Sequence, residues 1–420
     1  MTAFFIAFSV YVYTFMSYNV LIEGKGMSRK KNWPLRLAMV EFTYWFALGT
    51  VNYLTVYLEG NGFSVTQVGL INTVNALAAT LFSPVAGVIS DKIRSSLKGM
   101  IVFTTAMCIC YALVPLTMKI YILGMSLMIV FSAMYYAFSV PSESLLETTV
   151  VRGCENTGTD FATIRIGGTL GYVVVCALLS YFVTDDNVII TFYLLGLLIL
   201  PAFYAMSRIK EVSDSSDVQE RIALKDLPFG KLFRNPYFVC YAIFTILHFV
   251  PQMSVYYFQP YLIKDVGASM TYVGYLQAYR ALFEVPALLF SYKISRKISL
   301  RDMVIISAIL YAVQSFLYFG VNSFLQILAV TTLSGLGTGF YLAGGIRYVS
   351  EVAPEELQST AQTVIFSIRS LSGVLGGYFG AMLIEMWGLR EFYVSTGVVM
   401  LFSAVFLYVT TIVIKKSGNH

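Results

Sequence analysis

Long apolar segments without charge recur along the chain and alternate with short segments that carry most of the charged residues. A helix needs about 20 apolar residues to cross the hydrocarbon core of a bilayer, so each long segment predicts a membrane-spanning helix. The pattern predicts twelve such helices, over Leu37–Leu58, Thr66–Ile89, Gly99–Met118, Ile120–Ser142, Ile166–Thr184, Asn187–Ser207, Pro236–Ile263, Met270–Tyr292, two within Met303–Ile346 separated at Gly320–Ser323, Leu357–Ile384 and Phe392–Ile414.

The composition supports this interpretation and excludes two classes of protein. Of the 420 residues, 57% are hydrophobic and only 12% are charged. A soluble domain has about 25% charged residues, and a disordered chain is poor in apolar residues. We therefore expect an all-α integral membrane protein. The five cysteines show no spacing typical of a metal site or a disulfide framework, so we expect neither.

The basic residues are distributed unevenly between the two sides of the predicted membrane protein. If the residues before Leu37 are cytoplasmic, 22 of the 28 lysines and arginines lie in cytoplasmic loops and three lie in the opposite loops. Such an asymmetry is typical of multi-pass proteins, whose cytoplasmic loops are rich in lysine and arginine. We expect a protein of the cell membrane with both main-bundle termini in the cytoplasm. The net charge of +5 requires no nucleic acid partner.

Residues 1–26 precede this pattern and contain a further uncharged segment from Thr2 to Ile22. This segment lacks the basic start of a signal peptide, and its apolar part is too long for one. It is either a thirteenth helix or the result of a translation start placed too early. We favour the second interpretation, because Met27 is followed by the basic residues 29–31, as expected at a cytoplasmic N-terminus.

An internal repeat relates the two halves of the chain. Gly62–Gly69 recurs as Gly267–Gly274 at a shift of 205 residues, and Ile164-Arg165 recurs as Ile368-Arg369 at a shift of 204. The repeat predicts two six-helix bundles in parallel orientation. The N-terminal bundle spans residues 27–207, the C-terminal bundle spans residues 236–420, and a polar cytoplasmic linker spans residues 208–235.

Two such halves with a cytoplasmic connector resemble the major facilitator superfamily, whose substrate site lies near the midplane between the halves. Gly87, Asp91 and Lys92 are similar to the signature that follows the second helix in that family. The resemblance implies that they form a conformational latch on the cytoplasmic side. The glycine and paired bases that usually follow this signature are missing here.

Phe161–Tyr172 resembles the start of the fifth helix in the lactose permease and nucleoside proton symporter branch of this superfamily, with Ala162 in place of a glycine. In lactose permease a glutamate of helix 4 and the arginine of this motif bind the sugar, and an aromatic residue seven positions later stacks on it. The resemblance therefore implies that Arg165 and Tyr172 bind substrate. Glu143 and Glu147 lie one helical turn apart on the same face, and either is a candidate for the acidic partner.

Charged residues inside a span cost about 2.5–3.5 kcal/mol each at mid-helix, so they normally face a cavity. Arg280 and Glu284 are one helical turn apart in the eighth span, and the sequence at Glu284 resembles a helix 8 glutamate motif of the branch. A buried carboxylate beside an arginine can take up and release a proton when its surroundings change. We predict that Glu284 and Arg280 couple transport to protons, with help from His248 or Glu41.

Arg369, the repeat mate of Arg165, matches a lysine in helix 11 of the permease and is predicted to bind substrate. The resemblance has a limit, because Ser334 and Gly337 occupy the positions of a histidine and a glutamate in helix 10 of the permease. Proton coupling of the lactose permease type is therefore absent.

These features predict a secondary active transporter that moves a sugar, an oligosaccharide or a nucleoside by alternating access, with proton symport. We expect a monomer without a cofactor, whose partners are a small-molecule substrate, protons and the lipid bilayer. The sequence contains no Gly-x-x-x-x-Gly-Lys-Ser/Thr loop of an ATP-driven pump, and with only two histidines it does not predict a metal-dependent enzyme. The alternatives are an exporter, an organic-anion carrier or a non-transporting sensor on the same fold.

Overall fold

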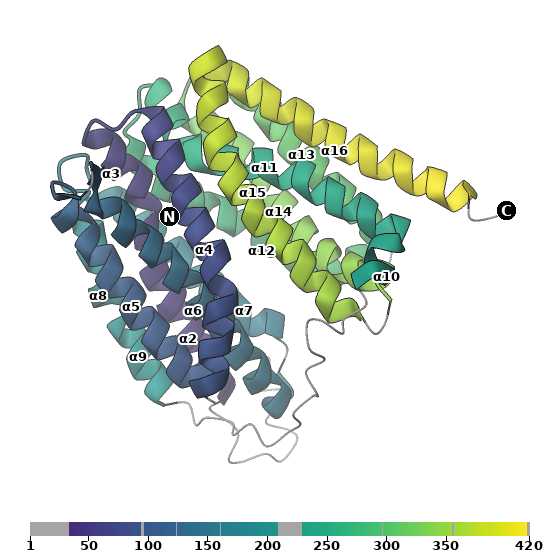
Figure 1. Cartoon of the computed structure of the whole chain (residues 1–420), viewed down its shortest axis with the longest axis horizontal. Coiled ribbons are helices and arrows are strands. Elements are labelled where there is room, and N and C mark those ends of the chain that lie inside the picture. The colour runs from purple at the N-terminus through teal and green to yellow at the C-terminus, as the bar shows by residue number, and fades with distance from the viewer. Residues whose placement is uncertain are drawn as a thin grey trace.

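The computed structural model is almost entirely helical (Figure 1). It describes residues 33–93, 96–122, 124–159, 161–208, 229–295, 297–354 and 357–417. The predictions for the N-terminal segment 1–26 and for most of the linker lie outside these residues.

The described part of the N-terminal half contains eight α-helices, a short 3-10 helix and a small hairpin. Its elements are α2 (Trp33–Leu48), η1 (Gly49–Tyr53), α3 (Leu54–Gly60), α4 (Val65–Ile93), α5 (Ser96–Thr117), β1 (Tyr121–Ile122), β2 (Met125–Ser126), α6 (Leu127–Thr157), α7 (Phe161–Phe182), α8 (Ile190–Leu198) and α9 (Leu200–Ser207).

The C-terminal half is built from long helices that follow one another with short connections. Its elements are α10 (Phe229–Arg234), α11 (Pro236–Asp265), η2 (Met270–Tyr272), α12 (Val273–Ser295), α13 (Leu300–Phe319), α14 (Phe324–Val352), α15 (Gln358–Trp387) and α16 (Leu389–Ser417).

Local sequence signals fix several of the helix ends. The side chain of Asn235 accepts a hydrogen bond from the backbone N–H of Tyr237 at the start of α11, with Pro236 at the first helical position, which is a favourable combination for helix initiation. Ser323 caps α14 in a similar way. Gly158 ends α6 with a φ of +68°, a conformation that glycine adopts without steric cost.

Nine segments of the described chain are long and apolar enough to cross a membrane. The other three predicted crossings correspond to α2 with η1 and α3, which a 3-10 turn divides, and to α6 and α12, which are less apolar. Together these segments form the predicted all-α membrane fold of two six-helix bundles.

Two predicted boundaries were wrong. The fourth span, predicted from Ile120, begins at Leu127, because β1 and β2 precede it as an antiparallel pair in which Ile122 is opposite Met125. An apolar run without periodicity cannot distinguish a short hairpin from the first turns of a helix. The second span was predicted to end at Ile89, but α4 continues to Ile93, so Asp91 and Lys92 belong to its last turns and not to a loop.

The two halves lie side by side and approach each other at one end only (Figure 1). We call the end that contains Gly60, Val65, Asp265 and Trp387 the converging end, and the opposite end the diverging end. Two helix pairs make the main contacts between the halves: α4 packs against α15, and α7 packs against α12. The repeat relates α4 to α12 and α7 to α15, so the two pairs are equivalent.

Glycines allow both of these pairs to approach closely. A Cβ atom added to Gly69 of α4 would lie 2.6 Å from the carbonyl oxygen of Gly377 in α15. A Cβ atom added to Gly274 of α12 would lie 2.6 Å from the carbonyl oxygen of Cys176 in α7. Gly69 and Gly274 are repeat mates, 205 residues apart. The same small residue therefore sets the helix spacing at both crossings.

Polar contacts reinforce the converging end. Thr66 donates a hydrogen bond to Glu385, and Lys264 forms an ion pair with Glu59. Lys264 and Glu59 occupy equivalent positions of the repeat, 205 residues apart. Ser180 Oγ donates to the carbonyl oxygen of Thr271 at 3.1 Å. Each of these contacts joins the N-terminal half to the C-terminal half.

Replacing Gly69 by valine should prevent closure of the converging end, because the added atoms would overlap the backbone of α15. Oxidative cross-linking between cysteines placed at Thr66 and Glu385 measures this closure. Cross-linking should be efficient in the parent chain and should fail with Gly69→Val. Gly196→Val is the matched control, since a Cβ atom at Gly196 has no neighbour within 4 Å. Equal cross-linking in both variants would contradict the tight crossing.

Candidate functional site

Arg165, near the start of α7, forms an ion pair with Glu41 of α2. Its Nη1 atom donates to Glu41 Oε2 at 3.1 Å, and its guanidinium lies 4.3 Å from the centre of the Trp45 ring. The Glu41 side chain is fully buried, whereas 29% of the Arg165 side chain is exposed. Glu41 Oε1 has no hydrogen-bond partner among the described residues. Gly168 makes room for the pair, because a Cβ atom there would lie 2.5 Å from Glu41 Oε2.

Glu143 and Glu147, the predicted partners of Arg165, do not form this ion pair. Both lie on α6 close enough to interact electrostatically with the site, Glu143 with Arg165 and Glu147 with Glu41. Glu143 is half-buried and Glu147 is exposed. The structure therefore groups three carboxylates around one arginine. The direct contact comes from Glu41, for which the sequence predicts a part in proton coupling.

Tyr172 lies two helical turns beyond Arg165 and takes part in a contact between the halves. Its hydroxyl donates to Asn52 Oδ1 at 2.9 Å, and the hydroxyl of Tyr256 from α11 donates to the same oxygen at 3.4 Å. Asn52 lies in η1, where the 3-10 turn interrupts the first crossing. Its Nδ2 atom donates to Cys176 Sγ at 3.3 Å. Asn52 is thus linked to the C-terminal half through Tyr256 and to α7 of its own half through Tyr172.

Arg280 and Glu284 lie on α12 at the same junction between the halves. The Arg280 guanidinium is 5.2 Å from the centre of the Tyr256 ring and interacts electrostatically with Tyr172 and Glu284. Glu284 interacts electrostatically with Arg280 and also with Arg165 of the other half. The two α12 residues do not form a direct ion pair within the described chain, so Glu284 is not locked to Arg280.

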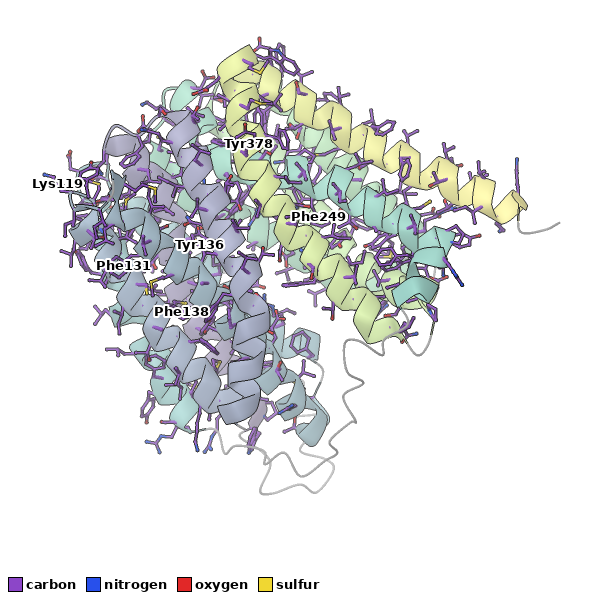
Figure 2. All side chains as sticks on the ribbon, in the orientation of Figure 1. Lys119, Phe131, Tyr136, Phe138, Phe249 and Tyr378 are labelled. Atoms are coloured by element: carbon purple, nitrogen blue, oxygen red, sulfur yellow. The ribbon has the colours of Figure 1, made fainter. Side chains whose placement is uncertain are left out.

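Arg369 and His248 lie in an aromatic environment within the C-terminal half. The Arg369 guanidinium is 4.6 Å from the Phe249 ring centre and 5.1 Å from the Tyr341 ring centre. His248 is buried and stacks on Phe244 at 5.4 Å between ring centres. Figure 2 shows Phe249, a residue of α11, next to α15 in this half.

A small, partly open cavity lies between the halves near this group of residues. Its walls come from η1, α3, α4 and α6 of the N-terminal half and from α11 and α12 of the C-terminal half. They are lined by Val51, Asn52, Leu54, Thr55, Asn72, Tyr136, Tyr256, Tyr257, Pro260, Val273 and Gln277. Asn72 Nδ2 and Gln277 Oε1 have no hydrogen-bond partner among the described residues. Amide and hydroxyl groups that point at a small cavity are suited to bind hydroxyl or base groups of a polar solute.

Gly87, Asp91 and Lys92 belong to α4, but their side chains lie outside the described residues. Their role stays a prediction.

Sequence reasoning missed several uncharged residues of this site. Asn52, Tyr256 and Gln277 carry no charge, so a search for costly ions inside spans does not find them. Trp45 and Phe249 had a usable signal, because they are 204 residues apart, the same shift that relates Arg165 to Arg369.

Comparison with known proteins agrees with this architecture. Residues 34–395 match the MFS_1 like family. The uncharacterized transporter YwbF of Bacillus subtilis (strain 168) is 26% identical over 80% of this chain and 84% of its own length. The maltose permease of Geobacillus stearothermophilus is 22% identical over 87% of this chain and 90% of its own length. The solved structure of the nucleoside transporter NupG has a TM-score of 0.70 at 16% identity, covering 93% of this chain and all of that one.

The family match covers most of the chain, and the solved structure shares its fold over nearly the full length. The chain therefore belongs to the MFS_1 like family, and it is a membrane transporter of the major facilitator type rather than an enzyme.

Proposed function

We propose that the protein is a secondary active transporter that carries a small polar solute, a sugar, oligosaccharide or nucleoside, by alternating access. One observation carries this proposal. At the junction between the halves, Glu284 interacts electrostatically with Arg280 on its own helix and with Arg165 of the other half. Charges of this cost inside a membrane normally line a substrate or ion pathway.

The substrate class is supported by the residues around the cavity and by two relatives. Asn52, Asn72, Tyr256 and Gln277 offer hydrogen-bonding groups without net charge, which suits hydroxyl-rich solutes or bases. A maltose permease and a nucleoside transporter are among the similar proteins. We assign solute binding to Arg165 with Glu143 or Glu147, to Tyr172 and to Arg369.

We further propose that transport is coupled to protons through Glu284, assisted by Arg280, His248 and Glu41. Glu284 is half-buried and has no direct ion pair within the described chain. Its two electrostatic neighbours are Arg280 on its own helix and Arg165 in the other half. Movement of one half relative to the other would change its distance from Arg165, and this would change its affinity for a proton.

The orientation follows from the distribution of basic residues. We propose a monomer in the cell membrane, with both main-bundle termini in the cytoplasm. Its bundles span residues 27–207 and 236–420, and residues 208–235 form the linker. The diverging end then faces the cytoplasm, and the conformation described here is inward-facing. In this account Gly87, Asp91 and Lys92 latch the cytoplasmic side when the halves close there.

Flux into proteoliposomes tests the proposal. Purified protein should accumulate labelled maltose or uridine when the interior is alkaline relative to the outside, and the accumulation should collapse when a protonophore is added. Equilibrium exchange without a proton gradient should continue. Accumulation that occurs only with a proton gradient of the opposite direction would indicate export. Absence of flux for every sugar and nucleoside tested, with binding intact, would favour a non-transporting sensor and contradict the proposal.

A further inference from the structure

The two halves contain the same arginine-on-aromatic arrangement. In the N-terminal half the Arg165 guanidinium lies 4.3 Å from the Trp45 ring centre, and in the C-terminal half the Arg369 guanidinium lies 4.6 Å from the Phe249 ring centre. Each arginine and each aromatic residue is separated from its counterpart by 204 positions. The supporting helices are equivalent too, since α2 packs on α7 and α11 packs on α15.

The two arrangements differ in one component. The N-terminal arginine pairs with Glu41 at 3.1 Å. The residue 204 positions after Glu41 is Thr245, which is fully buried and whose Oγ1 donates to the carbonyl oxygen of Tyr241 at 2.8 Å. The C-terminal half therefore keeps the cation and the aromatic platform but replaces the carboxylate by a neutral hydroxyl.

Nothing else in the described chain compensates the Arg369 charge. Its Nε atom is buried without a hydrogen-bond partner, although a guanidinium carries five N–H donors. His248, Tyr241 and Tyr341 lie near it, and none of them supplies a negative charge at neutral pH. Both ring nitrogens of His248, which is 1% exposed, also lack partners. By contrast, Arg280 has Glu284 as an electrostatic neighbour.

Arg369 is also on the helix face that meets the other half. Gly373, one helical turn further along α15, faces Tyr257 and Ala76, since a Cβ atom there would lie 3.1 Å from the Tyr257 hydroxyl and 3.4 Å from the Ala76 Cβ. Tyr257 lines the cavity between the halves. Residues four apart share a helix face, so Arg369 is within about 6 Å along the helix axis of a residue in contact with the cavity wall.

We propose that Arg369 binds an anionic group of the transported solute, a carboxylate or a phosphate, which occupies the position that the Glu41 carboxylate holds in the other half. The solute class is therefore a polar molecule with one acidic group, such as a sugar acid or a nucleotide. Planar guanidinium groups bind both anions through paired hydrogen bonds. The inference rests on the proposed transport function and changes its substrate from a neutral sugar or nucleoside to an acidic derivative of one.

Two matched ligand pairs test the inference on the full chain in phosphatidylcholine nanodiscs, where no anionic lipid headgroup is present. The pairs are glucose with glucuronate and uridine with uridine monophosphate, and the readout is ligand-dependent thermal stabilisation. The wild type should respond at lower concentration to the anionic member of at least one pair. Arg369→Gln should weaken binding of that member about tenfold or more and weaken binding of the neutral member much less, so that the preference is lost. Arg369→Lys should retain part of the preference.

Arg301→Gln is the matched control, because Arg301 pairs with Asp302 at the start of α13, away from the cavity. It should leave the preference intact. The inference is overturned if neither anionic member binds the wild type better than its neutral partner, if Arg369→Gln keeps the preference, or if Arg301→Gln loses it equally. If Arg369→Gln does not fold, competition in the wild type decides: inorganic phosphate should displace the anionic member but not the neutral one.

Flux measurements with the same pairs separate this inference from the proposed function. Flux of neutral solutes without any preference for anions would contradict the anion site and leave the transporter assignment intact. Binding of the anion at Arg369 without flux of any solute would support the anion site and contradict the proposed transport.

Discussion

Replacing Arg165 by glutamine should abolish solute flux and lower the free energy of unfolding by about 3–5 kcal/mol, the usual cost of leaving one partner of a buried ion pair without its counter-charge. Glu41 is fully buried, and the Arg165 guanidinium supplies the hydrogen bond to its Oε2 atom, while Oε1 has no partner in the described chain. The variant would therefore leave a carboxylate inside the membrane with neither oxygen paired. Thermal unfolding in detergent and labelled-solute flux in proteoliposomes measure the two effects.

A double variant separates the structural effect from the functional one. Glu41→Gln combined with Arg165→Gln removes both charges, so it should recover most of the lost stability. It should not recover flux, because the arginine that we assign to the solute is still missing. Wild-type stability in Arg165→Gln alone would contradict the buried ion pair, and wild-type flux in the double variant would contradict the binding role.

Replacing Glu284 by glutamine should abolish accumulation against a gradient while exchange at equilibrium continues. Glutamine has nearly the same shape as glutamate but cannot carry a proton, so the halves can still move around a bound solute without proton coupling. Neither Arg280 nor Arg165 forms a direct ion pair with Glu284 in the described chain, so the substitution should cost little stability. The measurement compares uphill uptake driven by a proton gradient with counterflow in the absence of a gradient.

Glu351→Gln is the matched control for this experiment. Glu351 is exposed in the last turn of α14 and lies away from the junction of the halves. It should accumulate solute as the wild type does. Uphill uptake by Glu284→Gln equal to that of the control would remove Glu284 from the coupling mechanism.

The fold was predictable because a bilayer imposes strong length and polarity constraints on a sequence. Charge-free segments and the Gly62–Gly69 repeat were sufficient to predict helices arranged in two related bundles. The hairpin at Tyr121–Ser126 was not predictable in this way, since its residues are as apolar as the helix that follows. Apolar content reports on depth in the membrane, and it does not report on local backbone conformation.

The site was predictable only in part. Charged residues inside spans are rare and costly, so Arg165, Arg280, Glu284 and Arg369 stood out in the sequence. Their partners did not. Glu41, and not Glu143 or Glu147, contacts Arg165, and this choice depends on how α2 packs against α7, which Gly168 permits. Such pairing depends on helix tilt and rotation, which a single sequence does not specify.

Access of a reagent to the cavity between the halves, measured from each side of the membrane, tests alternating access most directly. Ser370 follows Arg369 and lies three residues before Gly373, on the side of α15 that faces the other half. In a chain without its native cysteines, Ser370→Cys should react with an impermeant thiol reagent from the cytoplasmic side in the resting state. Transported solute with an inward proton gradient should slow this reaction and permit labelling from the outside. Alternating access to a cavity between the halves would be contradicted if Ser370→Cys were labelled from one side only and neither solute nor a proton gradient changed the labelling rate.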